Sequence, residues 1–322
     1  MSCEIFAVTD EASLAYGVQV ACGTPQTVLT SVRYTSESLA MTTEATESAE
    51  IRPDRNVTDL VRTSASVGGA IGFELSYGNF DPWIKGLLQA TGSLDGAGTT
   101  IKNGKTKQYL TFERNTPAGT GPTDFYTSFA DMQIASLDLQ IQQGSPVSGT
   151  WNVIGQGLPV NSGTSLDTIG GYTAANTNPI YNTVAGVGSV IIDGSPVGSV
   201  QGVTFTISNN LREQRALGSI APAGVANGKF VVTGNISIYF TDNVLASKFI
   251  NDQSFTLQID LEDTLGVTSG NKYTLTMNNC KFSTASAPVP GVGQDVLFTG
   301  DFQAVYNSGQ DGTITVASTN LV

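Results

Sequence analysis

The chain has 322 residues, of which only 13% are charged, and its net charge is −12. An acidic surface repels phosphates, which disfavours specific nucleic-acid binding. The absence of histidine excludes Ser-His and Cys-His catalytic arrangements as well as zinc sites built on His. The length suits two domains of ordinary size, and the 36 glycines suit short strands joined by many turns.

The first recognisable series of elements lies between residues 49 and 88. It opens with AEIRPDR, which carries Arg52 and Arg55, and continues through a turn expected at Gly68-Gly69. The run AIGFELSYG then alternates apolar and polar residues and predicts a half-buried strand. Asp81 is a suitable N-cap and Pro82 a suitable first residue for a short helix. Its predicted apolar stripe consists of Trp83, Ile84, Leu87 and Leu88.

Further strand candidates follow the predicted helix. They are KQYLTFERN, MQIASLDLQI (whose alternation breaks at Ser136) and GTWNVIG. The loop at 91–107 holds a local basic cluster of Lys102, Lys105 and Lys107. This cluster is either a solvated hairpin tip or a contact to an acidic surface of another subunit.

The same order of elements recurs about half a chain later. NNLREQR carries Arg212 and Arg215, and Asn227-Gly228 marks a turn before the alternating run KFVVTGNISIYF. Asp242 then precedes a second predicted helix, with a counterpart stripe of Val244, Leu245, Phe249 and Ile250. Strand candidates FTLQIDLED, KYTLTMNNCKF and VLFTGDFQAVY complete the copy.

This internal repeat predicts a mainly β protein with two tandem β-barrel or β-sandwich domains, each with one short flanking α-helix. We place the first domain at 1–160 and the second at 191–322. The segment 161–190 between them is rich in Gly, Asn, Ser and Thr, which predicts a linker or an extended arm.

The sequence offers little catalytic chemistry, and we predict neither enzymatic activity nor a cofactor or metal. Asp260, Glu262 and Asp263, or Glu47 and Glu50, are the carboxylate groups that a glycosidase could use, and the first group could also bind calcium. Acidic clusters of this kind are more often solvated surfaces.

The cysteines Cys3, Cys22 and Cys280 match no metal-binding or redox spacing, so we interpret them as free thiols of a protein made in a reducing cytoplasm. The N-terminal segment lacks the pattern of a secretory signal, and no run approaches the ~20 apolar residues of a membrane span. We therefore expect no membrane binding.

The two Arg-x-x-Arg segments have two interpretations. They form exposed ion pairs of little energetic value, or they form charge-assisted contacts between subunits. Their recurrence makes both segments candidates for self-assembly, with the contact residues Glu50, Arg52, Asp54, Arg55, Arg212, Glu213 and Arg215.

Residues 34–88 closely resemble a family of phage tail tube proteins. The resemblance is carried by Tyr34-Thr-Ser-Glu-Ser-Leu39, Glu50-Ile-Arg-x-Asp-Arg55, Glu74-Leu-Ser-Tyr-Gly78 and the following Phe80-Asp81. Asn209-Asn-Leu-Arg-Glu-Gln214 and Tyr239-Phe-Thr-Asp242 are similar to the continuation of that family. The likeness is weakest at 91–130 and in the central linker.

The resemblance implies a structural virion protein that self-assembles into stacked rings forming the tail tube. Six tube domains form a ring, so a chain with two domains would form homotrimeric, pseudo-hexameric rings. Expected partners are further copies of the chain, a tape-measure protein, a tail terminator, distal tail proteins and DNA that passes without specific binding. The resemblance also places the protein in the virion, assembled in the host cytoplasm, and suggests that the loop at 40–66 reaches a neighbouring ring.

Three alternatives remain open at this point. A capsid decoration or baseplate protein would share the β-rich composition. A carbohydrate-binding adhesin would expose several aromatic side chains, whereas Trp83 and Trp151 lie in segments with a core pattern. The third alternative is the enzyme with two catalytic carboxylates.

Overall fold

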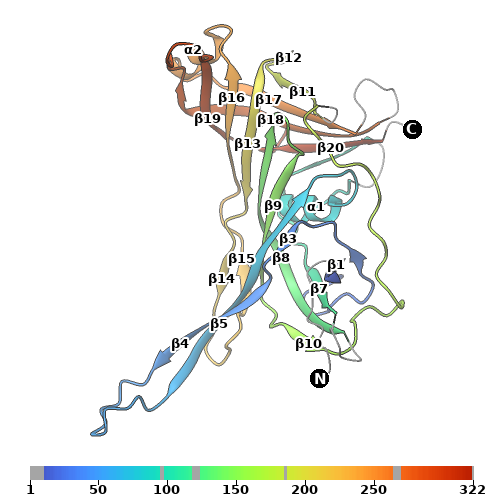
Figure 1. Cartoon of the computed structure of the whole chain (residues 1–322), viewed down its shortest axis with the longest axis vertical. Helices are drawn as coiled ribbons and strands as arrows, with labels where there is room; N and C mark the ends of the chain where they lie inside the picture. The colour runs from blue at the N-terminus through green and yellow to red at the C-terminus, as the bar shows by residue number, and fades with distance from the viewer. Residues whose placement is uncertain (1–10, 95–97, 118–123, 185–186, 264–269, 321–322) are drawn as a thin grey trace, which may run out of the picture.

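The computed structural model describes residues 11–94, 98–117, 124–184, 187–263 and 270–320. Over these residues the chain is mainly β with two short helices, as the sequence predicts, and its open sheets pack as a sandwich (Figure 1). Among the described residues, neither helix has the length and apolar character needed to cross a membrane. Cys22 and Cys280 are free thiols, and Cys3 lies outside the described residues.

Strands dominate the first half of the chain. Its elements are β1 (Ser13–Val18), β2 (Thr30–Ser31), β3 (Ser36–Glu37), β4 (Ala40–Glu47), β5 (Leu60–Glu74), α1 (Asp81–Leu88), β6 (Thr99–Lys102), β7 (Leu110–Thr116), β8 (Phe125–Gln142), β9 (Ser148–Gly155) and β10 (Val160–Ser162).

The second half is likewise built mainly of strands with one short helix. Its elements are β11 (Val187–Ile192), β12 (Ser195–Pro196), β13 (Val200–Ser208), β14 (Arg212–Gln214), β15 (Gly224–Ala226), β16 (Val231–Tyr239), α2 (Val244–Ile250), β17 (Phe255–Glu262), β18 (Asn271–Ser286), β19 (Leu297–Ala304) and β20 (Thr315–Asn320).

A central antiparallel sheet runs through both halves. From one end, β3 and β4 pair with β5, followed by β9 and β8. β8 then pairs with β13 of the second half, and the sheet continues through β16 and β19 to β18. The β8–β13 pairing, Ser136–Gln142 against Gly202–Ser208, joins the two halves into one pairing network.

The longest strand of each half, β8 in the first and β18 in the second, bends from one sheet of the sandwich into the other. The start of β8 pairs with β7 and β10, and its later part pairs with β9 and β13. β18 behaves the same way, pairing first with β17 and β20 and then with β19. A β-bulge lets a strand bend in this manner.

The bulges occur at matching places in the two halves. The register of β8 with β9 shifts between Ile134 and Ser136, where the alternation breaks in the sequence. The register of β18 with β19 shifts between Phe282 and Thr284. Phe282 follows Ile134, and Thr284 follows Ser136, by the same number of residues in the chain. The repeat read from the sequence therefore has a counterpart in strand order and in register.

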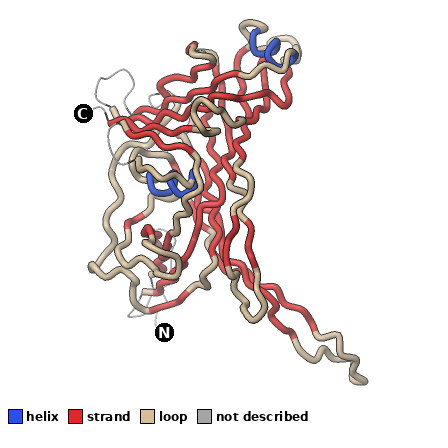
Figure 2. The backbone as a smooth tube through the Cα atoms, turned by 180° about the vertical axis from the view of Figure 1, so that it is seen from behind, coloured by secondary structure: helices blue, strands red, loops and turns tan. Residues whose placement is uncertain are grey.

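The expected Gly68-Gly69 turn is wrong, because both glycines lie inside β5. A Cβ on Gly69 would stand 2.6 Å from the carbonyl oxygen of Ser38, so the glycine permits close approach of the neighbouring strand. A Cβ on Gly234 in β16 would stand at the same distance from the carbonyl oxygen of Thr204. The segment 40–66 is likewise no loop, since β4 and the start of β5 form a long hairpin that projects from the body (Figure 2).

Helix α1 lies in an aromatic core. Its predicted stripe is buried, and the Trp83 ring meets Trp151 at 5.7 Å and Phe112 at 5.2 Å. Asp81 is the first helical residue, and Phe80 occupies the N-cap position. The N-cap expectation for Asp81 is therefore wrong, whereas Pro82 does lie in the first turn.

Helix α2 differs from its counterpart. The side chain of Asp242 accepts a hydrogen bond from the Val244 amide at 2.9 Å, with Asn243 at the N-cap position. None of the seven residues of α2 is buried, including the stripe Val244, Leu245, Phe249 and Ile250.

The segment between the halves runs along the first half. Thr173 bridges to Thr30 and Ile180 bridges to Ser76. The carbonyl oxygen of Tyr77 accepts hydrogen bonds from the side-chain amides of Asn176 and Asn178. Side-chain amides thus hold a segment that has few apolar residues to bury.

Two equivalent truncations, one in each helix, separate core packing from exposed packing. We expect Leu87→Ala to lower the free energy of unfolding of the unassembled chain by about 2–5 kcal/mol, because the side chain is 1% exposed. Ile250→Ala removes a side chain that is 78% exposed and should cost less than about 0.5 kcal/mol. Urea unfolding followed by tryptophan fluorescence measures both, and equal losses would contradict this account of the two helices.

Candidate assembly surfaces

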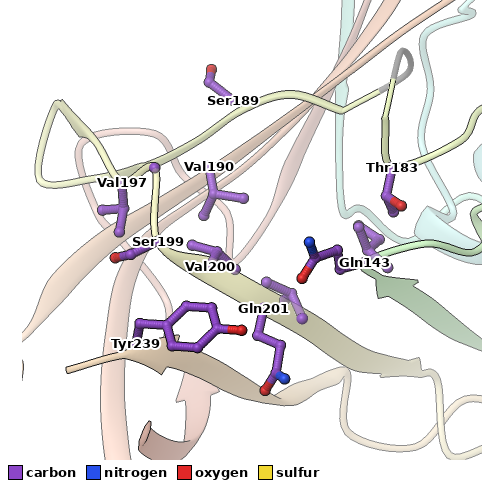
Figure 3. Close-up of a pocket in the computed structure, with 13 residues that line it drawn as sticks. Gln143, Thr183, Ser189, Val190, Val197, Ser199, Val200, Gln201 and Tyr239 are labelled. Atoms are coloured by element: carbon purple, nitrogen blue, oxygen red, sulfur yellow. The ribbon is translucent and has the colours of Figure 1, made fainter. Parts of the chain in front are cut away.

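The hollows in the surface contain no reactive constellation. The groove in Figure 3 is lined by residues of β11 and β13. Gln143 and Thr183 lie at one end of it, and Tyr239 lies at the other. Its lining consists of aliphatic, glycine, hydroxyl and amide side chains and contains no carboxylate, amine or thiol. Among the described residues, no group of three Asp, Glu or Cys side chains is placed to hold a metal ion.

Asp260, Glu262 and Asp263, one of the two carboxylate groups weighed above, are already paired. Lys272 reaches the carboxylates of Asp260 at 2.8 Å and Glu262 at 3.1 Å. Burial acts to lower the pKa of Lys272, but the hydrogen bonds that it donates to both carboxylates, together with their charges, outweigh burial and raise that pKa. Asp263 accepts two hydrogen bonds from Asn271. This arrangement is an ion-pair cluster between neighbouring strands.

The buried carboxylate Glu113 fastens the connecting segment to β7. It is 1% exposed and accepts hydrogen bonds from the hydroxyls of Ser165 and Tyr172 and from the Leu166 amide. Burial, followed by the hydrogen bond to Glu113, raises the pKa of the Tyr172 hydroxyl, which therefore stays protonated. A fully satisfied carboxylate of this kind holds a loop in place.

The first arginine pair lies at the end of the projecting hairpin. Arg52 and Asp54 form an exposed bidentate ion pair with a shortest distance of 2.7 Å, and the hydrogen bond from Arg52 holds the pKa of the Asp54 carboxyl well below its usual range. Arg55 adopts a left-handed backbone conformation with φ of 62°, which closes the turn. Glu50 lies in the same turn, and its amide donates to the Ser48 hydroxyl.

The second arginine pair lies at the base of that hairpin. Arg215 contacts Glu213 at 2.6 Å and donates to the Ser66 hydroxyl at 2.8 Å. Ser66 in turn donates to Glu213, and the Ala65 amide donates to the Ile220 carbonyl oxygen at 2.9 Å. Arg212 is exposed at the start of β14.

The structure therefore does not bring the seven candidate contact residues together. Those of the first copy end an arm, and those of the second copy brace the arm from within the same chain. Sequence reasoning missed this brace, although the polar, turn-rich stretch between Arg212 and Gly228 is typical of a hairpin.

The lysines of the 91–107 segment also contact the same chain. Lys102, in β6, pairs with Asp311 at 2.9 Å, and the Lys107 amine donates to the Val225 carbonyl oxygen. β6 itself pairs with β20 of the second half. Residues 95–97 of this segment lie outside the described part.

Apolar side chains gather on the projecting hairpin. Ile51 is 96% exposed, and Val57, Leu60 and Val61 are more than half exposed. Such a group on a narrow arm is typical of a surface that another protein covers.

One face of the central sheet is polar across both halves. The alternating inner residues, such as Leu139, Phe205 and Phe302, are buried. Their neighbours along the strands point outward and carry hydroxyl, amide and carboxylate groups. These outward residues line an open hollow, and they are Asp138, Gln140, Thr204, Thr206, Thr233, Asn235, Asp301 and Gln303.

Two strand edges of this sheet are open in the described residues. β3 and β4 pair with β5 on one side only. At the other end, residues 281–286 of β18 pair with β19 on one side only. An open strand edge offers unpaired backbone groups to another chain.

A model of the family described as phage tail tube protein matches residues 9–318, nearly the whole chain. No curated protein matches the chain significantly.

Proposed function

Because the chain belongs to the phage tail tube protein family, we propose that it self-assembles into stacked rings, three copies per ring, that form a tail tube. The family makes it a structural component of the virion tail. The observation that carries the ring proposal is the β8–β13 pairing inside the chain.

The internal pairing supplies a pattern for the contact between copies. β13 pairs with β16 in the way that β3 and β4 pair with β5, and the end of β18 corresponds by its bulge to the end of β8. The open edges are therefore the counterparts of the two strands that are joined inside the chain. Pairing the end of β18 with β3 and β4 of the next copy repeats the internal junction.

Such a contact is heterologous, since it joins two different surfaces, and a constant rotation closes it into a ring. Each chain supplies two tail-tube-like domains, 1–160 and 191–322, so six domains require three chains. The recurrent register of the bulges supports this division.

The polar face of the central sheet is the surface we assign to the lumen. Asp138 and Asp301 are acidic, and their neighbours on β13 and β16 are uncharged hydroxyls and amides. A surface without a cluster of basic groups gives passing DNA no phosphate contacts, so DNA would move through during ejection without specific binding.

The projecting hairpin is the element we assign to contact with the neighbouring ring. The apolar side chains Ile51, Val57 and Leu60 provide the buried contact, and Arg52 and Arg55 provide charged groups at its rim. The arm formed by β14 and β15 stiffens the hairpin base through Arg215 and Glu213.

Assembly in the host cytoplasm around a tape-measure protein, with a tail terminator and distal tail proteins at the two ends, completes the proposal. A capsid decoration or baseplate role would use the same open edges but would not give long tubes. The adhesin alternative loses its best residues, because Trp83 and Trp151 are fully buried. The paired state of Asp260 and Glu262 likewise disfavours a glycosidase.

Imaging of rings viewed along the tube axis tests the number of copies. We expect three chains per ring with threefold symmetry that approximates sixfold symmetry. A ring of six chains, or a purified protein that forms no rings or tubes in electron micrographs, would overturn the proposal.

Added lysines test the lumen assignment. We expect tubes of the Thr204→Lys/Thr233→Lys variant to retain linear duplex DNA at low salt and release it as salt rises, because lysines bind phosphates by displacing counterions. The control variant Thr204→Gln/Thr233→Gln has added bulk without charge and should not retain DNA. If intact lysine-bearing tubes retain no more DNA than the control, these residues do not line the lumen.

Shortening the hairpin tests ring stacking. Replacing residues 49–58 by a two-residue Asn-Gly turn keeps the base of the hairpin and its contacts with Arg215. We expect single rings in place of long tubes, as seen by electron microscopy and sedimentation. Tubes of normal length from the shortened chain would contradict the assigned role of the hairpin.

A further inference from the structure

The two helices that follow the long central strands have opposite environments. In α1 the side chains of Trp83, Leu87 and Leu88 are at most 1% exposed. In α2 no residue is buried, and Val244, Phe249 and Ile250 are 53%, 37% and 78% exposed. Phe240, just before α2, adds a further side chain that is 42% exposed. An aromatic and aliphatic surface of this kind is typical of an unoccupied interface.

The second half of the chain covers α1. Tyr273, at the start of β18, donates a hydrogen bond to the Asp81 carboxylate, accepts one from the Gly78 amide and lies with its ring 5.0 Å from that of Tyr77. Leu275 and Val316 close the apolar space beside Leu87 and Leu88. Residues of β18 and β20 therefore contribute to the burial of α1.

The first half contains a counterpart of this cover. In β8 the bulge against β7 falls between Phe129 and Met132, and in β18 the bulge against β17 falls between Met277 and Cys280. Phe125 precedes the bulge in β8 by the same number of residues as Tyr273 precedes the bulge in β18, so the two residues occupy corresponding positions. Phe125 is 48% exposed, whereas Tyr273 is 1% exposed.

A neighbouring strand extends the similarity. β10 pairs with the start of β8, as β20 pairs with the start of β18. On the face of the sheet that carries Phe125, β10 places Asn161 opposite Thr127, whereas Val160 lies opposite Ser128 and points to the other face. One chain therefore carries both an uncovered helix and an unused copy of the surface that covers such a helix.

We propose that the exposed face of α2 packs against Phe125 of a second copy of this chain, in the way that α1 packs beneath Tyr273. This inference rests on the proposed ring and names the surfaces that meet in it outside the sheet edges. The occupant is a second copy because this chain itself carries the counterpart of the internal cover, and because Phe125 and the α2 side chains Val244 and Ile250 are exposed in the single chain.

The chemistry of the two sites differs in a matching way. Asp81 is hydrogen bonded to the Tyr273 hydroxyl. The corresponding Asp242 already accepts a hydrogen bond from the Val244 amide of its own helix. Phenylalanine, which has no hydroxyl, stands at position 125 where the internal cover has tyrosine.

The positions of the surfaces suit contacts from one copy to the next. α2 lies at the top of the molecule and β10 at the lower part of the body, far from α2 (Figure 1). A chain cannot bring these two ends of itself together, so the contact must form between copies. Because the two surfaces differ, each copy contacts one neighbour through α2 and the other neighbour through Phe125, as a closed ring requires.

Two variants with one defect each provide the test. Ile250→Asp places a charge on α2 and leaves Phe125 intact, and Phe125→Asp does the reverse. Both residues are exposed in the single chain, so both variants should fold, with unchanged circular dichroism and unfolding midpoint. Val20→Asp, at a side chain that is 94% exposed and away from both surfaces, is the matched control.

We expect each variant alone to raise the concentration needed for ring formation by about tenfold or more, since removing a buried apolar contact at an interface centre costs more than about 1 kcal/mol. An equal mixture of the two should form heterodimers, seen by native mass spectrometry. The intact α2 of one variant can meet the intact Phe125 of the other, while the remaining ends are both defective.

The possible results separate the two proposals. If the unaltered chain and the Val20→Asp control form tubes and both test variants form them at the same concentration, the helix contact is wrong and the tube function stands. If the variants fail but their mixture gives no heterodimer, the two surfaces do not meet each other, which also overturns the inference. If the unaltered chain forms no rings, the proposed function itself fails.

Discussion

The antiparallel pairing of β8 with β13 is the contact on which the arrangement of the whole chain depends. It satisfies the backbone groups of two strands that would otherwise be open edges, one from each half. It also places the start of β18 and all of β20 over α1, so that the aromatic core of the first half is closed by residues of the second. Loss of this pairing would therefore expose both a strand edge and a helix.

The same constraint explains why the two halves are similar in topology but unequal in their surroundings. A duplicated unit that satisfies its own edge through its partner leaves the outermost edges of the pair unsatisfied. β3 and β4 remain open at one end, and the end of β18 remains open at the other. The exposed α2 and the exposed Phe125 are distributed in the same way. These features are what a chain needs if its internal contact is also the pattern for its contact with the next copy.

Divergence between the halves is concentrated in the projecting elements. The first half extends β4 and β5 into a long hairpin, whereas the second half has the short β14–β15 arm that lies against the base of that hairpin. Arg215 and Glu213 contact Ser66 there, and Arg52 pairs with Asp54 far along the hairpin. Two segments that look alike in sequence have thus taken different physical roles, one as a brace and one as a free end.

The sequence by itself located both helices and many of the long strands in their order, although β4 was expected as a loop and β13 was not predicted. Alternation of apolar residues located the main strands, including the irregularity at Ser136, and the stripe from Trp83 to Leu88 located α1, because burial on one face imposes these periods. Motifs were sufficient to indicate the tail tube family, which the match over residues 9–318 confirms.

Only the tertiary structure decided which surfaces are covered. The stripe of α2 has the same pattern as that of α1, yet only Leu245 packs against the core of this chain, and Val244, Phe249 and Ile250 stay exposed. Gly68 and Gly69 had the composition of a turn and lie within a strand, because close approach of a neighbouring strand also selects glycine. Pairing between β8 and β13, contact between Arg215 and Ser66, and the open strand edges all join residues far apart in the chain. Local patterns record what a segment must bury, whereas the partner that buries it is fixed only when distant segments, or a second chain, come together.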